Sequence, residues 1–380
     1  MKILITTDLF TTVTNGVVTS VRNLWDELKK NGHDVRILTL SETTKSHRNG
    51  DIYYIRSVPI GVYPGVRMPT SYRHRLIQEL IKWKPDVIHS QCELFSMQFA
   101  RRVSQMTGAP IVHTYHTMYE QYIGYVVPGK RLGKWLVRYL TLKRLKNVKL
   151  VIVPTDKMKK VLDGYSLGKQ IRVVPSGISL EQHKKRISEE QRIEKRKAWG
   201  IADNQPVLIN LGRLGTEKNL EELLNYFSTA LIENENMIFL IVGDGPAKEL
   251  LQKQAVELGI YNHVIFTGMV DPSEVQDYYQ LGDVFVSAST SETQGLTYIE
   301  AAANGLPLLC RQDPCLKDVI VQGENGYEYT CEKEFLDAIH TVIKDCSWRT
   351  AASKRSEEIA SAFDKKVFGA AVEEIYESIL

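Results

Sequence analysis

The stretch that decides the fold is Ser287-Ala-Ser-Thr-Ser-Glu-Thr-Gln-Gly-Leu-Thr-Tyr-Ile-Glu-Ala-Ala-Ala-Asn-Gly-Leu-Pro307. An apolar strand predicted over 283–287 runs into it, a loop of small polar residues follows, and a helix is expected to begin near Gln294 and Gly295. A helix N-terminus presents unpaired N–H groups and a partial positive charge, which suit phosphate and sugar oxygens. Glycine at this position lets a ligand approach the backbone closely. The stretch therefore predicts a ligand site at the carboxyl end of a strand.

Two glutamates in this stretch are candidate ligand contacts. Glu292 falls in the loop and Glu300 within the second turn of the expected helix. A carboxylate that accepts hydrogen bonds from two hydroxyl groups is typical of a sugar or ribose contact. The alternative is a pair of solvated surface glutamates, because helices are rich in this residue.

Strands alternate with helices on both sides of this stretch. This alternation predicts parallel sheets built from right-handed βαβ units, with ligands at the carboxyl ends of the strands. The expected strands are 2–7, 34–40, 86–90, 110–113 and 149–154 in the first half, and 206–210, 237–242, 263–266, 283–287 and 306–310 in the second. The expected helices are 17–31, 221–234, 247–258, 272–279 and 298–304.

The chain has 380 residues, a length that suggests two domains or one large one. Its 43% hydrophobic and 24% charged residues are typical of a globular protein and exclude a disordered chain. We expect a first α/β domain over 1–176 and a second over 177–362. The charged stretch 181–197 is interpreted as a solvated connection or surface helix. A C-terminal amphipathic helix over 363–380 is expected to pack back on the first domain, through a face that comprises Val367, Ala371, Ile375 and Ile379.

The formal net charge of +3 hides an asymmetry between the halves. Residues 1–176 carry 28 Lys and Arg against 12 Asp and Glu, a net of +16, and the remainder carries 20 against 33, a net of −13. Such an asymmetry suggests two domains with different partners, the basic one facing an anionic ligand or surface. We expect no nucleic-acid partner, because no nucleic-acid motif accompanies the charge.

Cysteine usage and targeting signals favour a reducing compartment. The five cysteines are scattered, without a C-x-x-C pair or a zinc-type spacing, and are interpreted as free thiols. Met1 leads directly into a strand rather than a signal peptide, and no run approaches the ~20 apolar residues of a membrane span. We expect a cytoplasmic protein, peripherally associated with the inner face of the cell membrane.

A cationic loop follows the first strand of the second half, at Gly212-Arg213-Leu214-Gly215-Thr216-Glu217-Lys218-Asn219. Arg213 offers a bidentate fork and Lys218 a point charge, a combination that suits a diphosphate. Fixed cations stabilise a leaving group that develops negative charge and replace a metal in that role. No Asp-x-Asp cluster suggests a metal, so none is expected. The alternative is two solvated charges on a loop.

Together these motifs resemble a known family. The Glu292-x7-Glu300 spacing with its flanks, and the Gly-Arg-Leu…Glu-Lys segment, resemble retaining glycosyltransferases of family four. The resemblance covers nearly the whole chain and is greatest to the diacylglycerol glucosyltransferases of that family. It implies the GT-B fold, in which two Rossmann-like α/β domains face each other across a cleft.

The resemblance also implies roles for individual residues. The catalytic group would comprise Arg213, Lys218 and Glu292 with His116, whose position in His-Thr-Met-Tyr touches the donor sugar in this family. We assign His116 to positioning and electrostatics rather than to covalent attack, and interpret His113 as structural. The donor-binding residues would be Gly16, Gly243, Gly268, Val270, Gln294, Gly295, Leu296, Thr297 and Glu300. The turns at Gly243 and Gly268 have a purely structural alternative.

The loop before the first helix departs from the family pattern. The family often has Gly-Gly where this chain has Asn15 and Gly16. Asparagine tolerates left-handed backbone geometry, so we expect the loop to keep its form.

A basic segment follows Tyr119. On a helix, Leu132, Trp135, Leu136, Tyr139 and Leu142 share one face, and basic residues are interleaved with them. Such a helix suits an anionic membrane surface, and the alternative is an ordinary packing helix with a solvated basic face. The expected membrane or acceptor contacts are Tyr119, Lys130, Arg131, Lys134, Trp135, Arg138, Lys143, Arg144 and Lys146.

These observations favour a retaining transferase that moves a hexose, expected to be glucose, from a UDP-sugar to a lipid such as diacylglycerol or glycosyl-diacylglycerol. No cofactor is expected besides the nucleotide-sugar substrate. One alternative is a transferase of the same family with a water-soluble acceptor. Another is a non-catalytic membrane-binding relic of the fold, which the intact glutamates and cations disfavour. A UDP-sugar epimerase would not need the basic segment, and a Rossmann oxidoreductase would need a dinucleotide fingerprint that is missing.

Overall fold

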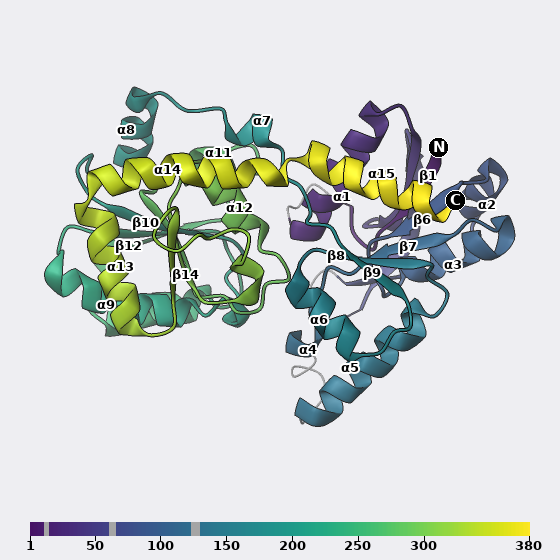
Figure 1. Ribbon diagram of the computed structural model, residues 1–380, viewed down its shortest axis with the longest axis horizontal. Coiled ribbons are helices and arrows are strands. Elements are labelled where there is room, and N and C mark those ends of the chain that lie inside the picture. The colour runs from purple at the N-terminus through teal and green to yellow at the C-terminus, as the bar shows by residue number, and fades with distance from the viewer. Residues whose placement is uncertain (11–14, 61–65, 123–129) are drawn as a thin grey trace. The chain divides into compact units, whose positions relative to one another are not determined.

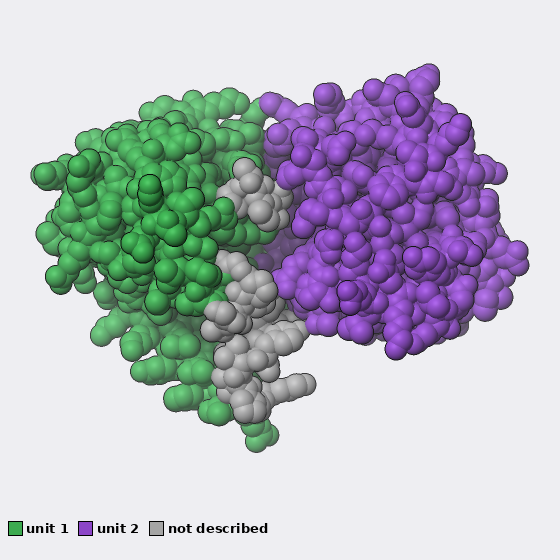
Figure 2. Space-filling view, turned by 180° about the vertical axis from the view of Figure 1, so that it is seen from behind, with its two compact units in different colours: residues 1–177, 365–380 green, residues 178–364 purple. Residues whose placement is uncertain are grey.

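The computed structural model describes residues 1–10, 15–60, 66–122 and 130–380. Parallel sheets with helices packed on their faces make up the chain, as the alternating pattern predicts (Figure 1). The chain divides into two compact units, which Figure 2 colours separately. Unit 1 comprises Met1–Gly177 together with Lys365–Leu380, and unit 2 comprises Ile178–Asp364.

Unit 1 is built on a sheet with the order β3-β4-β2-β1-β6-β7-β8-β9, and β5 pairs with β4. Neighbouring strands are parallel except where β3 and β5 run antiparallel to β4. The strands are β1 (Lys2–Thr6), β2 (Asp34–Ser41), β3 (His47–Asn49), β4 (Ile52–Pro59), β5 (Arg67–Pro69), β6 (Val87–Ser90), β7 (Ile111–Thr114), β8 (Leu150–Val153) and β9 (Gln170–Val173).

The helices of unit 1 cover this sheet, so its central strands are buried on both faces, as is usual for parallel sheets. Every residue of β6, β7 and β8 is buried. The helices are α1 (Gly16–Lys30), α2 (Arg75–Trp83), α3 (Ser96–Thr107), α4 (Tyr119–Tyr122), α5 (Lys130–Leu145), α6 (Asp156–Gly164) and α15 (Lys365–Ile379).

Helix α1 begins differently from the sequence expectation. Asn15 has an extended backbone with φ −142° and does not use the left-handed geometry that asparagine tolerates. Its side-chain Oδ1 accepts a hydrogen bond of 2.9 Å from the backbone N–H of Val18, so Asn15 is the N-cap of α1. Asparagine is among the preferred N-cap residues because it satisfies an N–H that has no helical partner. This capping role explains why asparagine precedes Gly16. Residues 11–14 of the same loop lie outside the described residues.

Unit 2 is built on an all-parallel sheet with the order β12-β11-β10-β13-β14-β15. Its strands are β10 (Val207–Leu211), β11 (Ile238–Val242), β12 (Val264–Gly268), β13 (Val284–Ser287), β14 (Leu308–Arg311) and β15 (Gly326–Tyr329). Its helices are α7 (Leu180–His183), α8 (Glu189–Ala198), α9 (Leu220–Glu233), α10 (Lys248–Glu257), α11 (Val275–Tyr279), α12 (Leu296–Ala303), α13 (Glu332–Lys344) and α14 (Cys346–Ala360). Short 3-10 turns lie at Thr216–Lys218, Tyr261–His263, Pro314–Leu316 and Ser361–Phe363.

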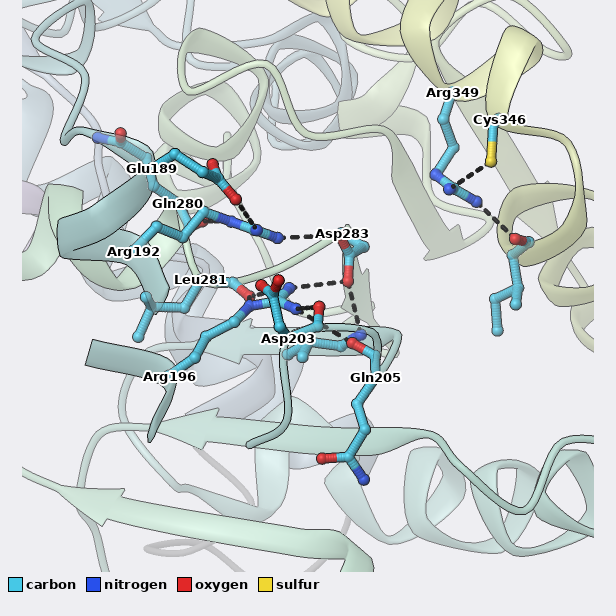
Figure 3. A network of polar contacts seen from close by, with 12 residues as sticks. Glu189, Arg192, Arg196, Asp203, Gln205, Gln280, Leu281, Asp283, Cys346 and Arg349 are labelled. Atoms are coloured by element: carbon cyan, nitrogen blue, oxygen red, sulfur yellow. Dashed lines mark hydrogen bonds and ion pairs between the residues drawn. The ribbon is translucent and has the colours of Figure 1, made fainter. Parts of the chain in front are cut away.

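The charged stretch before β10 contains a surface helix, one of the two forms that the sequence interpretation allowed, but it is not wholly solvated. It includes α8, and Arg196 in this helix is only 1% exposed. Its guanidinium donates to the backbone carbonyls of Leu281, Asp203 and Gln205 and pairs with the Asp283 carboxylate at 2.9 Å (Figure 3). A buried charge is tolerated when it is paired and hydrogen-bonded. Arg196 therefore ties α8 to the start of the second sheet.

The last helix, α15, belongs to unit 1 and packs beside α1 (Figure 1). Its buried face matches the predicted one in part, because Ile375 is buried and Ala371 and Ile379 pack against the same core. Val367 is 54% exposed, contrary to the prediction, and Phe368, Val372 and Tyr376 are also buried. Phe368 and Tyr376 bury more apolar area than Val367 would, and this area decides the orientation. Among the helices that the structure describes, none is both long and apolar enough to cross a bilayer.

Candidate functional site

Three loops meet at the carboxyl edge of the second sheet. Gly212 follows β10, Gly243 follows β11 and Gly268 ends β12. The N–H of Gly243 donates to the carbonyl of Gly268 at 3.1 Å, and the N–H of Leu214 donates to the carbonyl of Asp244 at 3.0 Å. These bonds bring together the predicted cationic loop and the two predicted glycine turns, at the edge where ligands of parallel sheets bind.

The close approach of another backbone segment explains why position 243 is a glycine. Its backbone has φ +134°, and a Cβ there would lie 1.9 Å from the carbonyl oxygen of Gly212. Only glycine fits so close an approach of two backbones. Gly268 also has a positive φ, of +74°, and Val270 beyond it is half-buried. Packing alone therefore requires glycine at position 243, independently of any ligand at this edge of the sheet.

The structure brings Lys218 and Glu292 into contact, although the sequence predicted them in separate motifs. The Lys218 ammonium forms an ion pair with Glu292 Oε1. The hydroxyl of Ser289 donates to the same oxygen at 2.9 Å. Both charged side chains are partly exposed, so solvent reaches the pair. Arg213, from the same loop as Lys218, has an exposed side chain.

Helix α12 begins at Leu296, directly after Gln294 and Gly295, near which its start was predicted. Gly295 is its N-cap with φ +77°, and a Cβ there would lie 2.3 Å from the ring of Tyr298. Gln294 and Gly295 are buried, whereas Leu296 and Thr297 in the first turn are half-buried. The half-buried turn leaves the helix N-terminus within reach of a ligand.

The carboxylate of Glu300 accepts a hydrogen bond from a residue that was not predicted from the sequence. The hydroxyl of Tyr279, in α11, donates to Glu300 Oε2 at 2.9 Å. Burial raises the pKa of Tyr279 well above its usual value, and the Glu300 carboxylate adds to this effect. Tyr279 therefore stays protonated and remains a hydrogen-bond donor to Glu300.

The remaining predicted catalytic residue, His116, lies in unit 1 just after β7. Its Nε2 lies 2.7 Å from Oε1 of Gln91, which follows β6. An amide oxygen only accepts hydrogen bonds, so Nε2 of His116 carries the proton in this contact. Burial lowers the pKa of His116 to about 4, and His116 is therefore neutral near pH 7. Gly16, the predicted glycine of unit 1, is exposed in the first turn of α1.

A second buried contact in unit 1 joins two more residues of the sequence analysis. Glu93, 5% exposed, accepts from the Tyr119 hydroxyl at 2.6 Å, and His113 Nε2 lies 2.9 Å from its other oxygen. Burial raises the pKa of Tyr119 well above its usual value, and the carboxylate of Glu93 contributes to the rise. His113 is fully buried within this network, so the structural interpretation suits it.

Gln91 and Glu93 were not predicted from the sequence, although a signal for them was present. They follow the buried strand β6 closely, as His116 follows β7, and polar side chains in that position line the carboxyl edge of a parallel sheet. The prediction missed them because the expected strand ended at Ser90 and no recognised family motif includes the residues that follow it.

Helix α5 and the residue after it present an apolar and basic surface to solvent, which we call the α5 face. Its members are Leu132, Trp135, Tyr139, Leu140, Arg131, Lys134, Arg138, Lys143 and Lys146, all exposed. Trp135 is 60% exposed and stacks on Tyr139 with ring centroids 5.7 Å apart. The opposite side of the helix, through Val137, Thr141 and Leu145, is buried. Arg144 is half-buried, and the side chain of Lys130 lies outside the described residues.

The described residues, 1–10, 15–60, 66–122 and 130–380, contain no cluster of three His, Cys, Asp or Glu side chains that fits a metal ion. In unit 2 the candidate site combines glycine turns, the Lys218–Glu292 ion pair, Arg213, the start of α12 and Glu300 with its tyrosine partner. Unit 1 separately contains His116 with its glutamine partner. The groups of unit 2 suit a ligand that carries hydroxyl groups and phosphates.

Known proteins resemble the chain over nearly its whole length. It is 34% identical over 372 residues to the alpha-monoglucosyldiacylglycerol synthase of Streptococcus pneumoniae, covering 97% of this chain and 84% of the relative. It is 30% identical over 387 residues to the protein of the same name from Acholeplasma laidlawii, covering 99% and 96%. The crystal structure of Anabaena Alr3699/HepE in complex with UDP and glucose superimposes with a TM-score of 0.77 at 17% identity, over 100% of both chains.

Family models match both parts of the chain. Residues 14–182 match the model described as Glycosyltransferase Family 4, and residues 191–359 match the one described as Glycosyl transferases group 1. The solved neighbour shares the α/β architecture of two parallel-sheet units, which confirms the predicted GT-B fold class. The chain therefore belongs to the glycosyltransferases of group 1 and family 4, as its motifs predicted.

Proposed function

We propose that the chain transfers a hexose, glucose, from a UDP-sugar to a membrane lipid acceptor such as diacylglycerol or glycosyl-diacylglycerol. The transfer retains the anomeric configuration and uses neither a metal nor a cofactor. Two near-full-length relatives named alpha-monoglucosyldiacylglycerol synthase support this acceptor class and this sugar. The protein acts as a peripheral enzyme at the cytoplasmic face of the membrane.

The donor binds at the carboxyl edge of the second sheet. The diphosphate contacts Arg213, Lys218 and the N-terminus of α12, where fixed positive charge stabilises the leaving group. The carboxylate of Glu300 accepts hydrogen bonds from the ribose hydroxyls. Glu292 holds Lys218 through their ion pair and contacts the sugar. The uracil lies against the backbone at Gly268 and Val270.

His116 positions the transferred sugar. Its pKa of about 4 keeps the imidazole neutral at physiological pH, so it acts as a hydrogen-bonding group and not as a cation. Gln91 fixes its tautomer by accepting from Nε2, which leaves Nδ1 as an acceptor for a sugar hydroxyl. Exclusion of water from the donor limits hydrolysis of the sugar.

The observation that carries the lipid acceptor is the α5 face. A helix of a globular protein usually buries its apolar residues, yet here Leu132, Trp135 and Tyr139 are exposed beside basic side chains. A basic amphipathic surface with aromatic residues binds an anionic membrane interface. A soluble acceptor would give no reason for this exposure.

A transfer assay tests the proposal. The enzyme is given UDP-glucose or UDP-galactose with anionic vesicles that contain diacylglycerol or glucosyl-diacylglycerol, and labelled lipid is extracted. We expect labelled lipid from UDP-glucose, with at least one of the two acceptors, and undiminished product in the presence of a metal chelator. A Glu300→Ala variant should lose donor affinity in the same assay.

Three outcomes contradict parts of the proposal separately. Lipid labelled only from UDP-galactose makes glucose wrong while the lipid acceptor stands. No labelled lipid, together with UDP release that rises with soluble acceptors, moves the function to the soluble-acceptor alternative. Neither lipid product nor UDP release with any acceptor supports the non-catalytic alternative.

A further inference from the structure

Tyr279 is a buried tyrosine whose hydroxyl meets a charged partner. The side chain is 0% exposed and packs against Phe285 and His183. The hydroxyl lies 2.9 Å from Glu300 Oε2 and 3.5 Å from the carbonyl of Thr297. The shorter contact is the hydrogen bond, since a hydroxyl donates once and a charged acceptor at 2.9 Å is the stronger partner.

A phenolic hydroxyl in so apolar a position is costly unless it is hydrogen-bonded. Phenylalanine would fill the same space without that cost, so the tyrosine hydroxyl is explained by its partner, Glu300. Glu300 itself is half-buried, so its carboxylate is open to a ligand on one side. Tyr279 touches no ligand from its buried position and acts only through the glutamate.

We propose that Tyr279 is a positioning residue that gives the donor site its preference for nucleotides with intact ribose hydroxyls. This inference rests on the proposed function, in which Glu300 accepts from the ribose. A carboxylate offers about four acceptor positions on its two oxygens. Tyr279 occupies one position on Oε2 and stops the carboxylate from rotating, which directs the remaining positions toward two neighbouring hydroxyls.

The chain offers a matched control for the loss of such a bond. Tyr329 is also 0% exposed, and its hydroxyl donates to Glu222 Oε1 at 3.2 Å. Glu222 is paired with Arg311 at 2.6 Å and has no place in the proposed donor site. Tyr279→Phe and Tyr329→Phe therefore remove the same group from the same kind of contact, and only the first bears on Glu300.

The experiment measures the affinities of UDP, 2′-deoxy-UDP and 3′-deoxy-UDP by calorimetry on the full chain. A site that hydrogen-bonds a hydroxyl rejects the analogue that lacks it, so the wild type should prefer UDP by about tenfold or more. Tyr279→Phe should lower this preference by at least about threefold, whereas Tyr329→Phe should leave it unchanged. In a Glu300→Ala background, which has no side-chain acceptor for the Tyr279 hydroxyl, Tyr279→Phe should have no further effect on the preference.

The outcomes distinguish this inference from the proposed function. An unchanged preference in Tyr279→Phe, with a reduced preference in Glu300→Ala, overturns the positioning role alone. A wild type that binds no UDP, or binds all three nucleotides equally, overturns the ribose role of Glu300 and the inference with it.

A fraction of unfolded protein does not alter the result, because the preference is a ratio measured within one variant. If Tyr279→Phe does not fold at all, 4-fluorophenylalanine installed at position 279 fills the space of the hydroxyl without supplying a donor. This variant should lower the preference likewise, and an unchanged preference in it would overturn the inference.

Discussion

At the scale of single residues, histidines whose pKa is lowered by burial make the protein sensitive to acid. Burial lowers the pKa of His89, His116 and His183 below the ordinary value of 6.5. His89 is fully buried, and its two ring nitrogens lie 2.7 Å from the hydroxyls of Tyr376 and Thr114. Neutral imidazole has one donor and one acceptor, which two hydroxyls satisfy without a charge.

The free energy of unfolding should therefore fall as the pH is lowered from about 6.5 towards 4. In this range the unfolded chain binds protons on His89 and His116, whereas the folded chain binds them only at lower pH. Each such histidine contributes about 1.4 kcal/mol per pH unit to the slope. Denaturant unfolding at closely spaced pH values measures the slope, and His89→Gln should reduce it by that amount.

The matched control for the histidine prediction is His340→Gln. This residue is exposed at the surface of α13. Its replacement should leave the slope over the same pH range unchanged. An unaltered slope in His89→Gln would mean that the acid sensitivity arises from other groups.

The candidate site was predictable where one local motif contained its residues. Glu292 and Glu300 share a strand–loop–helix segment, so their spacing identified both. Tyr279 and Gln91 were not predictable, because each contributes through a contact with a residue 21 or 25 positions away in the sequence. Such contacts exist only once the sheet has aligned the ends of its strands. The roles of all these residues in donor binding stay predictions.

At the scale of elements, α5 is oriented by its smaller residues. Val137, Thr141 and Leu145 face the core of unit 1, and the larger aromatic residues remain in solvent. Arg101, in α3, donates to the carbonyls of Lys143 and Arg144 at 2.7 and 2.6 Å. Carbonyls in the last turn of a helix have no helical partner, so Arg101 caps α5 and fixes its orientation.

Neutralising part of the α5 face should weaken binding to anionic vesicles. Each basic residue near such a surface contributes ~1 kcal/mol. The variant Lys134→Gln/Arg138→Gln/Lys143→Gln should therefore bind about 100-fold more weakly, since ~1.4 kcal/mol corresponds to a tenfold change. Sedimentation with vesicles of phosphatidylglycerol and phosphatidylcholine measures the effect. The salt dependence of binding should also become shallower, because fewer charges contribute.

A control variant with the same change in net charge separates location from total charge. Lys253, Lys333 and Lys354 are exposed on unit 2, and their replacement by glutamine should reduce vesicle binding much less. Equal losses in both variants would show that net charge alone attracts the vesicles. Undiminished vesicle binding in the α5 variant would support the alternative, in which α5 is an ordinary packing helix with a solvated basic face.

Among the elements, those with a strong apolar pattern were predictable and those without it were not. The apolar run in β11 is buried throughout, and its sequence alone identified it as a strand. Strand β15, with the sequence Gly-Tyr-Glu-Tyr at the edge of its sheet, is only half-buried at its two middle residues and escaped prediction. Helix α14 was also missed, because its polar residues show little periodicity. Edge strands and surface helices are specified by their neighbours more than by their own sequence.

At the scale of the whole molecule, the chain returns to the unit in which it began. Residues 365–380 complete a core that the first 177 residues leave open, since Phe368 and Val372 pack among Ile3, Ile5 and Val21. Counted by these units, unit 1 has 30 basic and 15 acidic residues, and unit 2 has 18 and 30. The charge asymmetry that the sequence indicated therefore follows the structural division and not merely the two halves of the chain.

Because α15 completes unit 1, damage to this helix should destabilise unit 1 from the far end of the chain. Phe368 is 3% exposed, and Phe368→Ala should cost about 3–5 kcal/mol through the lost burial and the cavity. Its neighbour Val367 faces solvent, so Val367→Ala should cost less than about 0.5 kcal/mol. Hydrogen exchange locates the effect, because amides that open with unit 1 lose protection together. In Phe368→Ala we expect faster exchange in β1 and α1 and unchanged exchange in β10 and β11; faster exchange in unit 2, or none in unit 1, would contradict the assignment of α15 to the first core.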